Sequence, residues 1–398
     1  MSNILIVTGQ FVPFTRSLGG VLRVYSFLQS LKKKNKLFLL VSKDKSKKNF
    51  GYLGLPKKKM KGIVIKYIDN KNSNISLFNF AGFKNFFYLL GFDYVYNLKE
   101  NYYNECIKII KNYNIKYLIV SAPPFSLFFL IKKIRSHFKD LIVILDYRDG
   151  WSSRINNLVL SPLKFIIKVF FEKKILRYSN YIMTSTANIH KEIKSFFKDF
   201  TKVLLVRNGF LTIPKNKKKN NKKIIIGYFG LLSDVPSSYR NIRVIYDAVS
   251  KNNLLKNKFV FEFYGNNFIK DKNIRYFKSF RFKNNLDYNK ALSKMTQMDY
   301  LLILHTESST AKEMVTTKFY DYLSSRTHII NISSGNTEVG KIIDRHKLGY
   351  NINYDKIDIS SFLHKINKPK NKLQWLNKYN IFSRDYQNKK LVKIINKL

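Results

Sequence analysis

The sequence predicts an α/β protein made of two doubly wound domains. Short apolar stretches typical of buried strands alternate with amphipathic helical stretches, and this pattern stops and restarts around one basic, Asn-rich segment at 215–223. That segment has no apolar residue, which indicates a domain boundary. At 398 residues the chain is also long for a single hydrophobic core. We therefore expect a first domain at 1–210, a linker at 211–222 and a second domain at 223–377.

The first 210 residues have the alternating order of a Rossmann-like domain. The expected strands lie at 3–8, 36–42, 62–68, 117–121, 141–146, 181–184 and 203–206. The expected helices lie at 21–31, 106–113, 126–138 and 162–178. A Lys-rich stretch at 43–61 is expected to be a solvated loop, and the aromatic-rich stretch 76–103 is expected to be helical in part.

The second domain repeats the same alternation. Its expected strands lie at 223–229, 259–264, 300–304 and 328–332. Its expected helices lie at 241–251, 288–296 and 339–346, with an acidic helix following the strand at 300–304. Ligands of such sheets bind beyond the carboxyl ends of the strands, so we expect the site in a cleft between the two domains.

The chain carries a formal net charge of +48, from 73 basic and 25 acidic residues. One interpretation is an anionic partner, such as a membrane surface, a nucleic acid or a phosphorylated substrate. The other is codon bias, because Lys, Asn and Ile are all abundant and the lysines are spread along the whole chain. Both interpretations stay open, and both can hold.

Cysteine usage and hydropathy predict a cytoplasmic protein that is not integral to the membrane. Cys106 is the single cysteine, which excludes an intrachain disulfide and fits a reducing compartment. The N-terminus lacks the charged and apolar regions of a signal peptide. The longest nearly apolar stretch, 117–131, is interrupted by Ser121, Pro123 and Pro124 and is too short to span a bilayer.

The most informative stretch is 299–323, which reads DYLLILHTESSTAKEMVTTKFYDYL. An apolar strand is followed by a polar loop and then by a helix expected to begin near 315–317, with Thr316 as its cap. Glu313 and Asp321 would share one face if the helix covered both. Carboxylates bind sugar hydroxyls and a helix N-terminus binds phosphate, so this combination predicts a nucleotide-sugar site and a glycosyltransferase.

Two further pairs of residues are candidates for binding phosphate. Gly19 and Gly20 are expected in the loop after the first strand, where paired glycines allow a backbone to approach a phosphate closely or simply form a flexible turn. Arg240 and Arg243 lie at the start of the helix after the first strand of the second domain. They are either a bidentate clamp for a pyrophosphate or two of many surface cations.

The sequence LDYRDGW at 145–151 ends another expected strand. Asp146, Arg148 and Asp149 are either site residues or the beginning of a solvated loop. Trp151 favours a site, because sugars stack on aromatic faces.

Motifs of several other enzyme classes are missing from the sequence. There is no GxSxG elbow, no Walker A sequence and no GxGxxG fingerprint, which argues against esterase, P-loop and dinucleotide-binding functions. The histidines show no metal-ligand spacing such as HExxH, and no Asp-x-Asp motif occurs in a candidate site.

Taken in order, several segments resemble the retaining GT-B-fold glycosyltransferases that use nucleotide sugars, of the bacterial glycosyltransferase group 1 or family 4 type, in its capsule and lipopolysaccharide branch. The matching segments are the opening strand with Gly19-Gly20, 121–126 (SAPPFS), 146–151 (DYRDGW), Glu172 with 178–184, Asn208-Gly209, 227–230 with Arg240, 313–323, and Phe382-Ser383-Arg384. The resemblance implies two Rossmann-like domains facing across a cleft. It also implies a C-terminal helix, about 378–398, that crosses back to the first, acceptor-side domain.

The resemblance also implies roles for individual residues. Glu313 would bind hydroxyls of the donor sugar, and Asp321 would bind the ribose of the nucleotide. The donor diphosphate would be held by backbone N–H groups at Val315, Thr316, Thr317, Gly19 and Gly20, and by the side chain of Arg240. Asp146, Arg148 and Asp149 would join Glu313 in the catalytic region.

Two positions depart from the family pattern. Asp321 stands where the family usually has Glu, and Asp146 stands where many members have a histidine in the cleft. The basic partner expected on the second domain is either Arg243 or Lys318.

By the same resemblance, the reaction would retain the anomeric configuration and need neither a metal ion nor another cofactor. The partners would be a nucleotide-sugar donor and a glycan or lipid-linked acceptor, in bacterial surface polysaccharide synthesis, with a hexose as the expected sugar and no nucleic-acid partner. Two rival functions remain: a nucleotide-sugar 2-epimerase of the same fold, and a basic nucleic-acid-binding protein prompted by the charge of +48.

The sequence also suggests peripheral docking on the inner face of the cytoplasmic membrane. The stretch 76–103 is rich in aromatics, and 162–178 carries lysines and an arginine among bulky apolar residues. Basic and aromatic side chains together favour an anionic lipid surface. The alternative is that both helices simply pack on the sheet.

Overall fold

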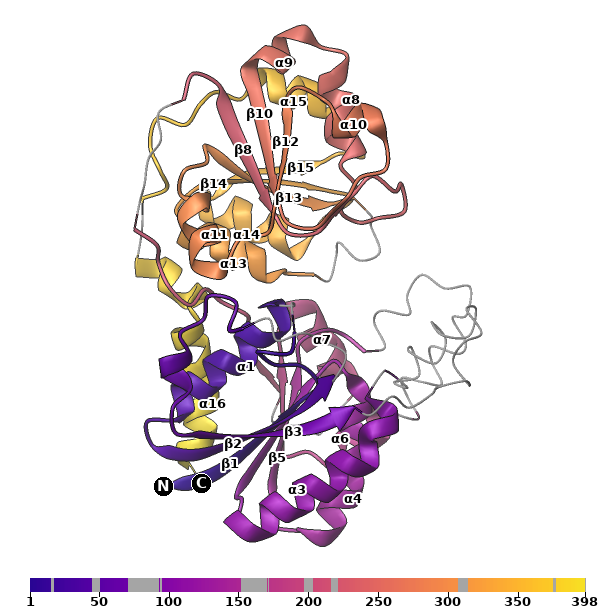
Figure 1. The fold of residues 1–398 in the computed structure, drawn as a ribbon, viewed down its shortest axis with the longest axis vertical. Coiled ribbons are helices and arrows are strands. Elements are labelled where there is room, and N and C mark those ends of the chain that lie inside the picture. Colours follow the sequence, from indigo (N-terminus) through magenta and orange to yellow (C-terminus); the bar gives the residue numbers. More distant parts are fainter. Residues whose placement is uncertain are drawn as a thin grey trace. The chain divides into compact units, whose positions relative to one another are not determined.

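The computed structural model describes residues 1–15, 18–44, 51–70, 93, 95–151, 170, 172–196, 203–215, 221–306, 314–374 and 377–397. The chain divides into two compact units, one formed by Met1–Arg207 with Arg384–Leu398 and the other by Asn208–Ser383 (Figure 1).

A seven-stranded parallel sheet forms the centre of the first unit. Its strands are β1 (Ser2–Thr8), β2 (Asn35–Asp44), β3 (Ile63–Asn70), β4 (Tyr117–Ala122), β5 (Ile142–Tyr147), β6 (Tyr181–Thr184) and β7 (Val203–Leu205), in the order β3-β2-β1-β4-β5-β6-β7. The strand order reverses between β1 and β4, which pair in register from Ile4↔Tyr117 to Thr8↔Ser121. This is the doubly wound arrangement predicted from the sequence.

Helices cover both faces of this sheet (Figure 1). They are α1 (Leu18–Leu31), α3 (Lys99–Tyr113), α4 (Leu130–His137), α6 (Lys173–Leu176), α7 (Ala187–Phe196) and α16 (Arg384–Lys397), with 3-10 turns η1 (Lys57–Met60), η3 (Tyr96–Leu98) and η4 (Phe125–Phe129). Side chains such as Leu5 and Val7 pack with α3 and α4, while α1 and α16 pack together elsewhere on the unit. The burial of both faces explains why central strands such as β1 and β4 are continuous apolar runs rather than alternating ones.

The second unit contains a six-stranded parallel sheet. Its strands are β8 (Ile224–Phe229), β10 (Phe259–Tyr264), β12 (Phe280–Lys283), β13 (Tyr300–His305), β14 (His328–Ser333) and β15 (Gly349–Asn353), in the order β12-β10-β8-β13-β14-β15. The short strands β9 (Leu232–Ser233) and β11 (Asn267–Phe268) pair separately. The order reverses between β8 and β13.

Two groups of helices flank this second sheet (Figure 1). One group is α8 (Arg243–Ser250), α9 (Asn253–Lys258), α10 (Lys272–Arg275) and α15 (Ile359–Lys365), and the other is α11 (Tyr288–Met295), α13 (Thr317–Ser324) and α14 (Glu338–His346), followed by the 3-10 turn η7 (Asn377–Phe382). Side chains of β8, β10 and β13 form one apolar cluster with α8, α9 and α15.

Several predicted boundaries need correction. Gly19 and Gly20 lie in the first turn of α1, because that helix begins at Leu18 and not at Val21. Helix α3 begins at Lys99, earlier than the predicted 106. Of the predicted helix 162–178, the structure describes residues 170 and 172–178, which include the short helix α6 (Lys173–Leu176). Most of the aromatic stretch 76–103 lies outside the described residues.

The C-terminal helix α16 packs within the first unit. The Asn388 side chain donates a hydrogen bond to Ser30 Oγ (2.9 Å) on α1, and the Tyr117 hydroxyl donates to the Ile395 carbonyl (3.0 Å). No helix within the described ranges has the length and apolar character needed to traverse a bilayer.

Candidate functional site

The candidate site lies in the second unit, where the strand order reverses. Ligands of doubly wound sheets bind outside the carboxyl ends of the two strands on either side of such a reversal. Here β8 ends at Phe229, followed by Gly230, and β13 ends at His305. Helix α13, which follows β13 along the chain, is anchored at the same edge because the Phe229 N–H donates to the Tyr322 hydroxyl (3.0 Å).

Two glycines bring the backbone very close together at this edge. Gly230 and Gly265 have φ values of +135° and +140°, which favour glycine. A Cβ on Gly265 would lie 2.3 Å from the Gly230 carbonyl oxygen, so no larger residue fits there without a backbone shift. A Cβ on Gly230 would lie 3.1 Å from Lys318 Nζ. The turn after β8 therefore leaves room for the Lys318 side chain.

Two cations gather at this edge without a carboxylate at ion-pair distance among the described residues. Lys318 Nζ lies 4.0 Å from the centre of the Tyr228 ring, and the Arg240 guanidinium lies 4.7 Å from the centre of the Tyr239 ring. Aromatic faces stabilise cations only modestly. The positive charge of this pair is therefore largely uncompensated and suits an anionic ligand.

The burial and proximity of these groups shift their pKa values. Burial and then the charge of Arg240 hold the pKa of Lys318 well below its usual range. Burial, Lys318 and Arg240 lower the pKa of His305 to about 3. His305 is therefore neutral at physiological pH, and its buried Nδ1 has no hydrogen-bond partner among the described residues. The sequence had singled out histidines only for metal spacing, so it missed this residue.

The loop that carries Arg240 is tied to the end of β13. The Thr306 N–H donates to the Tyr239 carbonyl (3.0 Å), and the Thr306 hydroxyl donates to the Ser238 carbonyl (3.0 Å). These bonds hold Arg240 beside His305 even though about 65 residues separate them in the sequence.

Helix α13 points its N-terminus toward this group of residues. It begins at Thr317, and Thr316 is its N-cap, as predicted, with extended backbone angles (φ −67°, ψ 152°). The Thr316 side chain makes no capping bond, and its buried hydroxyl has no partner among the described residues. Val315 is buried, whereas Thr317 and Lys318 are half-buried. The first N–H groups of a helix have no acceptor within it, so they are available to a ligand.

Asp321 lies one turn further along α13. Its carboxylate is buried and accepts a hydrogen bond from the Tyr288 hydroxyl (2.8 Å) on α11. Glu313 lies outside the described residues. Residues 314–316 are not helical, so α13 does not cover both acids, and the shared helical face considered from the sequence does not form.

Arg243 differs from Arg240 in its contacts. Its Nε donates to the Asp234 carbonyl (2.9 Å), and its terminal nitrogen pairs with Asp271 (2.9 Å). The Asp234 carboxylate in turn accepts from the backbone N–H groups of Lys270 and Asp271. The Arg243 side chain therefore links the loops that carry Asp234 and Asp271. Lys318 is the cation that lies near Arg240 at the sheet edge.

In the first unit, Asp146 is completely buried at the end of β5. It forms an ion pair with Arg23 of α1 (2.6 Å) and accepts a hydrogen bond from the Ser121 hydroxyl (2.7 Å). These contacts occupy both carboxylate oxygens, so Asp146 has a structural role that joins α1, β4 and β5.

Arg148 and Gly20 are in direct contact. Arg148 donates to the Gly20 carbonyl (2.9 Å) and to the Pro123 carbonyl, and a Cβ on Gly20 would lie 2.6 Å from the guanidinium. The absence of a side chain at Gly20 therefore leaves room for the Arg148 guanidinium to reach the Pro123 carbonyl at the end of β4. Gly19 precedes it in the same turn of α1, and Asp149 is half-buried in the loop after β5.

Trp151 does not offer a free face to a sugar. Its ring stacks on Phe125 (5.2 Å between centres, 10° between planes), and only 3% of its surface is exposed. The stacking predicted from the sequence is therefore corrected: the indole belongs to an aromatic core cluster. Within the described part of the chain, no group of three or more His, Cys, Asp or Glu side chains is arranged to hold a metal ion.

No protein-family model and no curated protein sequence matches this chain. Solved structures match it over nearly its whole length. Sucrose-phosphate synthase from Thermosynechococcus elongatus has a TM-score of 0.66 at 9% identity, covering 100% of this chain and 99% of that one. HepE from Anabaena, in complex with UDP and glucose, has a TM-score of 0.61 at 10% identity, covering 99% of each chain.

A third similar structure is the lipopolysaccharide outer core galactosyltransferase WaaB, with a TM-score of 0.57 at 12% identity and 100% of both chains covered. The fold is GT-B. At these identities, the GT-B fold is what the chain shares with the three proteins.

Proposed function

We propose that this protein is a retaining glycosyltransferase that moves a sugar, a hexose in our proposal, from a nucleotide-diphosphate sugar to an acceptor. The observation that carries the proposal is the pairing of Arg240 with Lys318 beside the N-terminus of α13, with no carboxylate at ion-pair distance among the described residues. A diphosphate carries the charge that this edge lacks.

The donor would bind with its diphosphate between these cations and the first turn of α13. Gly230 allows the approach because it has no side chain, and the neutral ring of His305 supplies a polar contact that needs no counter-charge. Asp321, held by Tyr288, would accept hydrogen bonds from the nucleotide ribose. Glu313 would bind the hydroxyls of the sugar.

The similar structures support this donor class. HepE was solved with UDP and glucose, and another similar structure is an α,α-trehalose-phosphate synthase of the UDP-forming type from Burkholderia xenovorans, solved with glucose-6-phosphate. HepE was also solved with UDP-glucose, so a nucleotide sugar and a sugar phosphate are both ligands of proteins with this fold.

In the proposed reaction, the bond between the anomeric carbon and the diphosphate oxygen breaks. The acceptor oxygen bonds to the same face of the sugar, and its proton passes to the leaving diphosphate. The protein contributes positioning and electrostatic stabilisation of the leaving group. Arg240, Lys318 and the α13 N-terminus would supply this stabilisation in place of a divalent cation.

We further propose that the acceptor is a glycan or a lipid-linked sugar in bacterial surface polysaccharide synthesis, and that the enzyme acts in the cytoplasm at the membrane surface. The galactosyltransferase WaaB, named for the lipopolysaccharide outer core, supports this role. Most of the predicted membrane-facing stretch 76–103, and residues 162–169 and 171 of the stretch 162–178, lie outside the described residues.

A ligand screen followed by product analysis tests the proposal. A nucleotide sugar at 100 times its dissociation constant should stabilise the protein by about 2.7 kcal/mol in a thermal-shift assay. With the best donor and an acceptor mixture, transfer should persist in excess chelator, and the product should keep the donor's anomeric configuration. Activity lost in chelator and restored by magnesium would refute the metal-independent reaction, and an inverted product would refute retention. Rearrangement of the sugar without transfer would favour the epimerase.

A further inference from the structure

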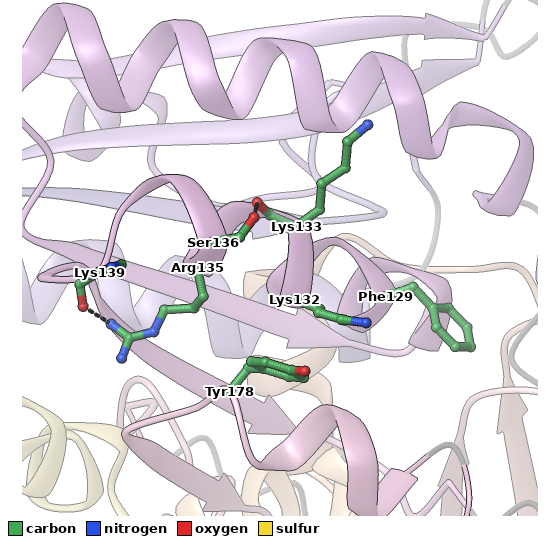
Figure 2. A pocket seen from close by; sticks show the side chains of 7 residues that line it. All are labelled: Phe129, Lys132, Lys133, Arg135, Ser136, Lys139 and Tyr178. Atoms are coloured by element: carbon green, nitrogen blue, oxygen red, sulfur yellow. Dashed lines mark hydrogen bonds between the residues drawn. The ribbon is translucent and has the colours of Figure 1, made fainter.

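A basic groove lies on the outer surface of the first unit, along α4. It has a volume of about 660 Å³ and is lined by Phe129, Lys132, Lys133, Arg135, Ser136, Lys139 and Tyr178. Four of these seven residues are cationic and none is acidic. Figure 2 shows the Lys132 side chain extending between Phe129 and the ring of Tyr178, which come from η4 and from the turn after α6.

The groove is separate from the candidate donor site and from the ligand edge of its own sheet. Lys139 lies just before β5, and Tyr178 lies just before β6. These are the amino ends of the strands, whereas ligands of the doubly wound sheet bind at the carboxyl ends. The end of the groove that Lys139 and Tyr178 form is therefore at the sheet edge opposite the expected ligand edge.

Two of the four cations are already engaged. Lys133 pairs with Glu100 (3.1 Å) and lies 3.9 Å from the centre of the Tyr103 ring, so it points toward α3. Arg135 donates to the carbonyls of Lys139 and Leu141 (2.5 Å each), which fixes its guanidinium at one end of the groove. These bonds go to backbone oxygens, so the Arg135 charge is not neutralised.

Lys132 and Lys139 remain as exposed ammonium groups with no ion pair among the described residues. An anion held by both would also approach the fixed Arg135, with an aromatic ring on each side of Lys132. A phosphate with an attached apolar portion matches this combination of charge and aromatic walls.

The neighbouring surface extends the same chemistry. Lys174 and Arg177, on and just after α6, are exposed, and Phe170 is 65% exposed with Lys174 near its ring. An exposed aromatic beside several cations is typical of surfaces that meet anionic lipids, where the ring enters the interface and the cations contact headgroups.

We propose that the α4 groove binds the phosphate headgroups of an anionic membrane and so docks the first unit on the lipid surface. The proposal rests on the membrane location in the proposed function and specifies the surface that makes the contact, and its test does not depend on sugar transfer. It also locates the functional part of the +48 charge at specific lysines, among many that reflect composition.

The test compares two charge-reversal variants of the full-length protein. One is Lys132→Glu with Lys139→Glu, in the groove. The control is Lys33→Glu with Lys61→Glu, which are exposed lysines of the same unit away from the groove. Each pair replaces two positive by two negative charges and so changes the formal net charge from +48 to +44. Since net charge is matched, only a specific site separates the two variants.

Binding is measured by sedimentation with phosphatidylglycerol vesicles, and with phosphatidylcholine vesicles as the neutral reference. We expect the wild type and the control to bind the anionic vesicles and the groove variant to bind at least about tenfold more weakly. About 0.5 M salt should weaken the binding of all three proteins. Donor binding in solution should be the same for all three.

Three results would overturn the proposal. Equal loss in both variants would make the charge purely compositional. Groove-dependent stabilisation by inorganic phosphate in a thermal-shift assay, without vesicle binding, would identify a soluble phosphate as the ligand. Groove-dependent binding of single-stranded DNA, without vesicle binding, would identify a nucleic acid.

Discussion

Arg23 and Asp146 form a buried ion pair that joins α1 to the end of β5. Arg23 Nε lies 2.9 and 3.0 Å from the two carboxylate oxygens, and a second guanidinium nitrogen lies 2.6 Å from one of them. Arg23 also donates to the Val206 carbonyl (2.8 Å), just after β7. One arginine thus connects a helix to two strand ends at the centre of the first unit.

Removing one partner of this pair should destabilise the protein strongly. Asp146→Ala leaves the Arg23 charge buried without its counter-charge, which costs about 3–5 kcal/mol of unfolding free energy. Replacing both residues, as Arg23→Met with Asp146→Leu, should cost much less, because no buried charge remains. Urea unfolding measures both. A loss below about 1 kcal/mol for Asp146→Ala would contradict the structural role of the pair.

Substitutions of Arg240 and Arg243 should have different effects: the first should lower ligand affinity, and the second should lower stability. Arg240→Ala removes a cation that has no carboxylate partner, so affinity for the nucleotide diphosphate should fall at least about tenfold while the melting temperature stays unchanged. Arg243→Ala breaks the contacts with Asp271 and the Asp234 carbonyl, so it should cost about 1 kcal/mol of stability and little affinity. Calorimetry and thermal unfolding give the two readouts. Arg275→Ala, in the same unit and exposed, controls for lost charge. If Arg243→Ala weakened binding more than Arg240→Ala, the assignment would be reversed.

Donor binding should be linked to proton uptake by Lys318. In the free protein, burial and Arg240 lower the pKa of the Lys318 ammonium, and a bound diphosphate raises it by supplying a counter-charge. Binding therefore takes up a proton between the free and bound pKa values, and affinity falls as the pH rises through that range.

Calorimetry with a nucleotide sugar in two buffers of different ionisation enthalpy measures this proton uptake. Lys318→Arg should abolish it, since arginine stays protonated. Identical binding enthalpies for the wild type in both buffers, at every pH from neutrality up to the ordinary pKa range of lysine, would exclude the linkage.

Glu313→Gln should reduce transfer at least about tenfold and leave the fold intact. The substitution keeps the shape of the side chain and removes charge-assisted hydrogen bonds to the sugar, each of which contributes about 1.5–3 kcal/mol. Glu307→Gln makes the same chemical change six residues earlier and should retain activity. Near-wild-type transfer by a folded Glu313→Gln protein would remove Glu313 from the site.

The sequence predicted the elements with a continuous apolar run. The strands at Phe259–Tyr264 and Tyr181–Thr184 were placed at the residues where they occur. The strands β12 and β15 were not predicted, because β12 (FRFK) and β15 (GYNIN) carry polar or small residues in short segments that lack a clear period. The helix α7 was also not predicted. Gly19 and Gly20 were placed in a loop because glycine disfavours helices, yet contact with Arg148 requires a residue without a side chain at Gly20.

The sequence identified residue types suited to a site but not their surroundings. Arg240 and Arg243 have the same chemistry and nearly the same position, and only the fold brings Asp271 to one of them. Trp151 has the ring that a sugar site needs, but Phe125 covers it. His305 carried no sequence signal, since its importance comes from the burial of its ring beside Lys318 and Arg240.

Because α16 belongs to the first unit, that unit is discontinuous in the chain, and its parts are synthesised at different times. A ribosome makes all of Asn208–Ser383 before it makes Arg384–Lys397, the helix whose Leu391, Ile394 and Ile395 are buried in the first unit. The surface of α1 against which α16 packs therefore stays uncovered until the second unit has been synthesised. A chimaera that exchanges the first unit between GT-B proteins needs two crossover points, one on each side of the second unit.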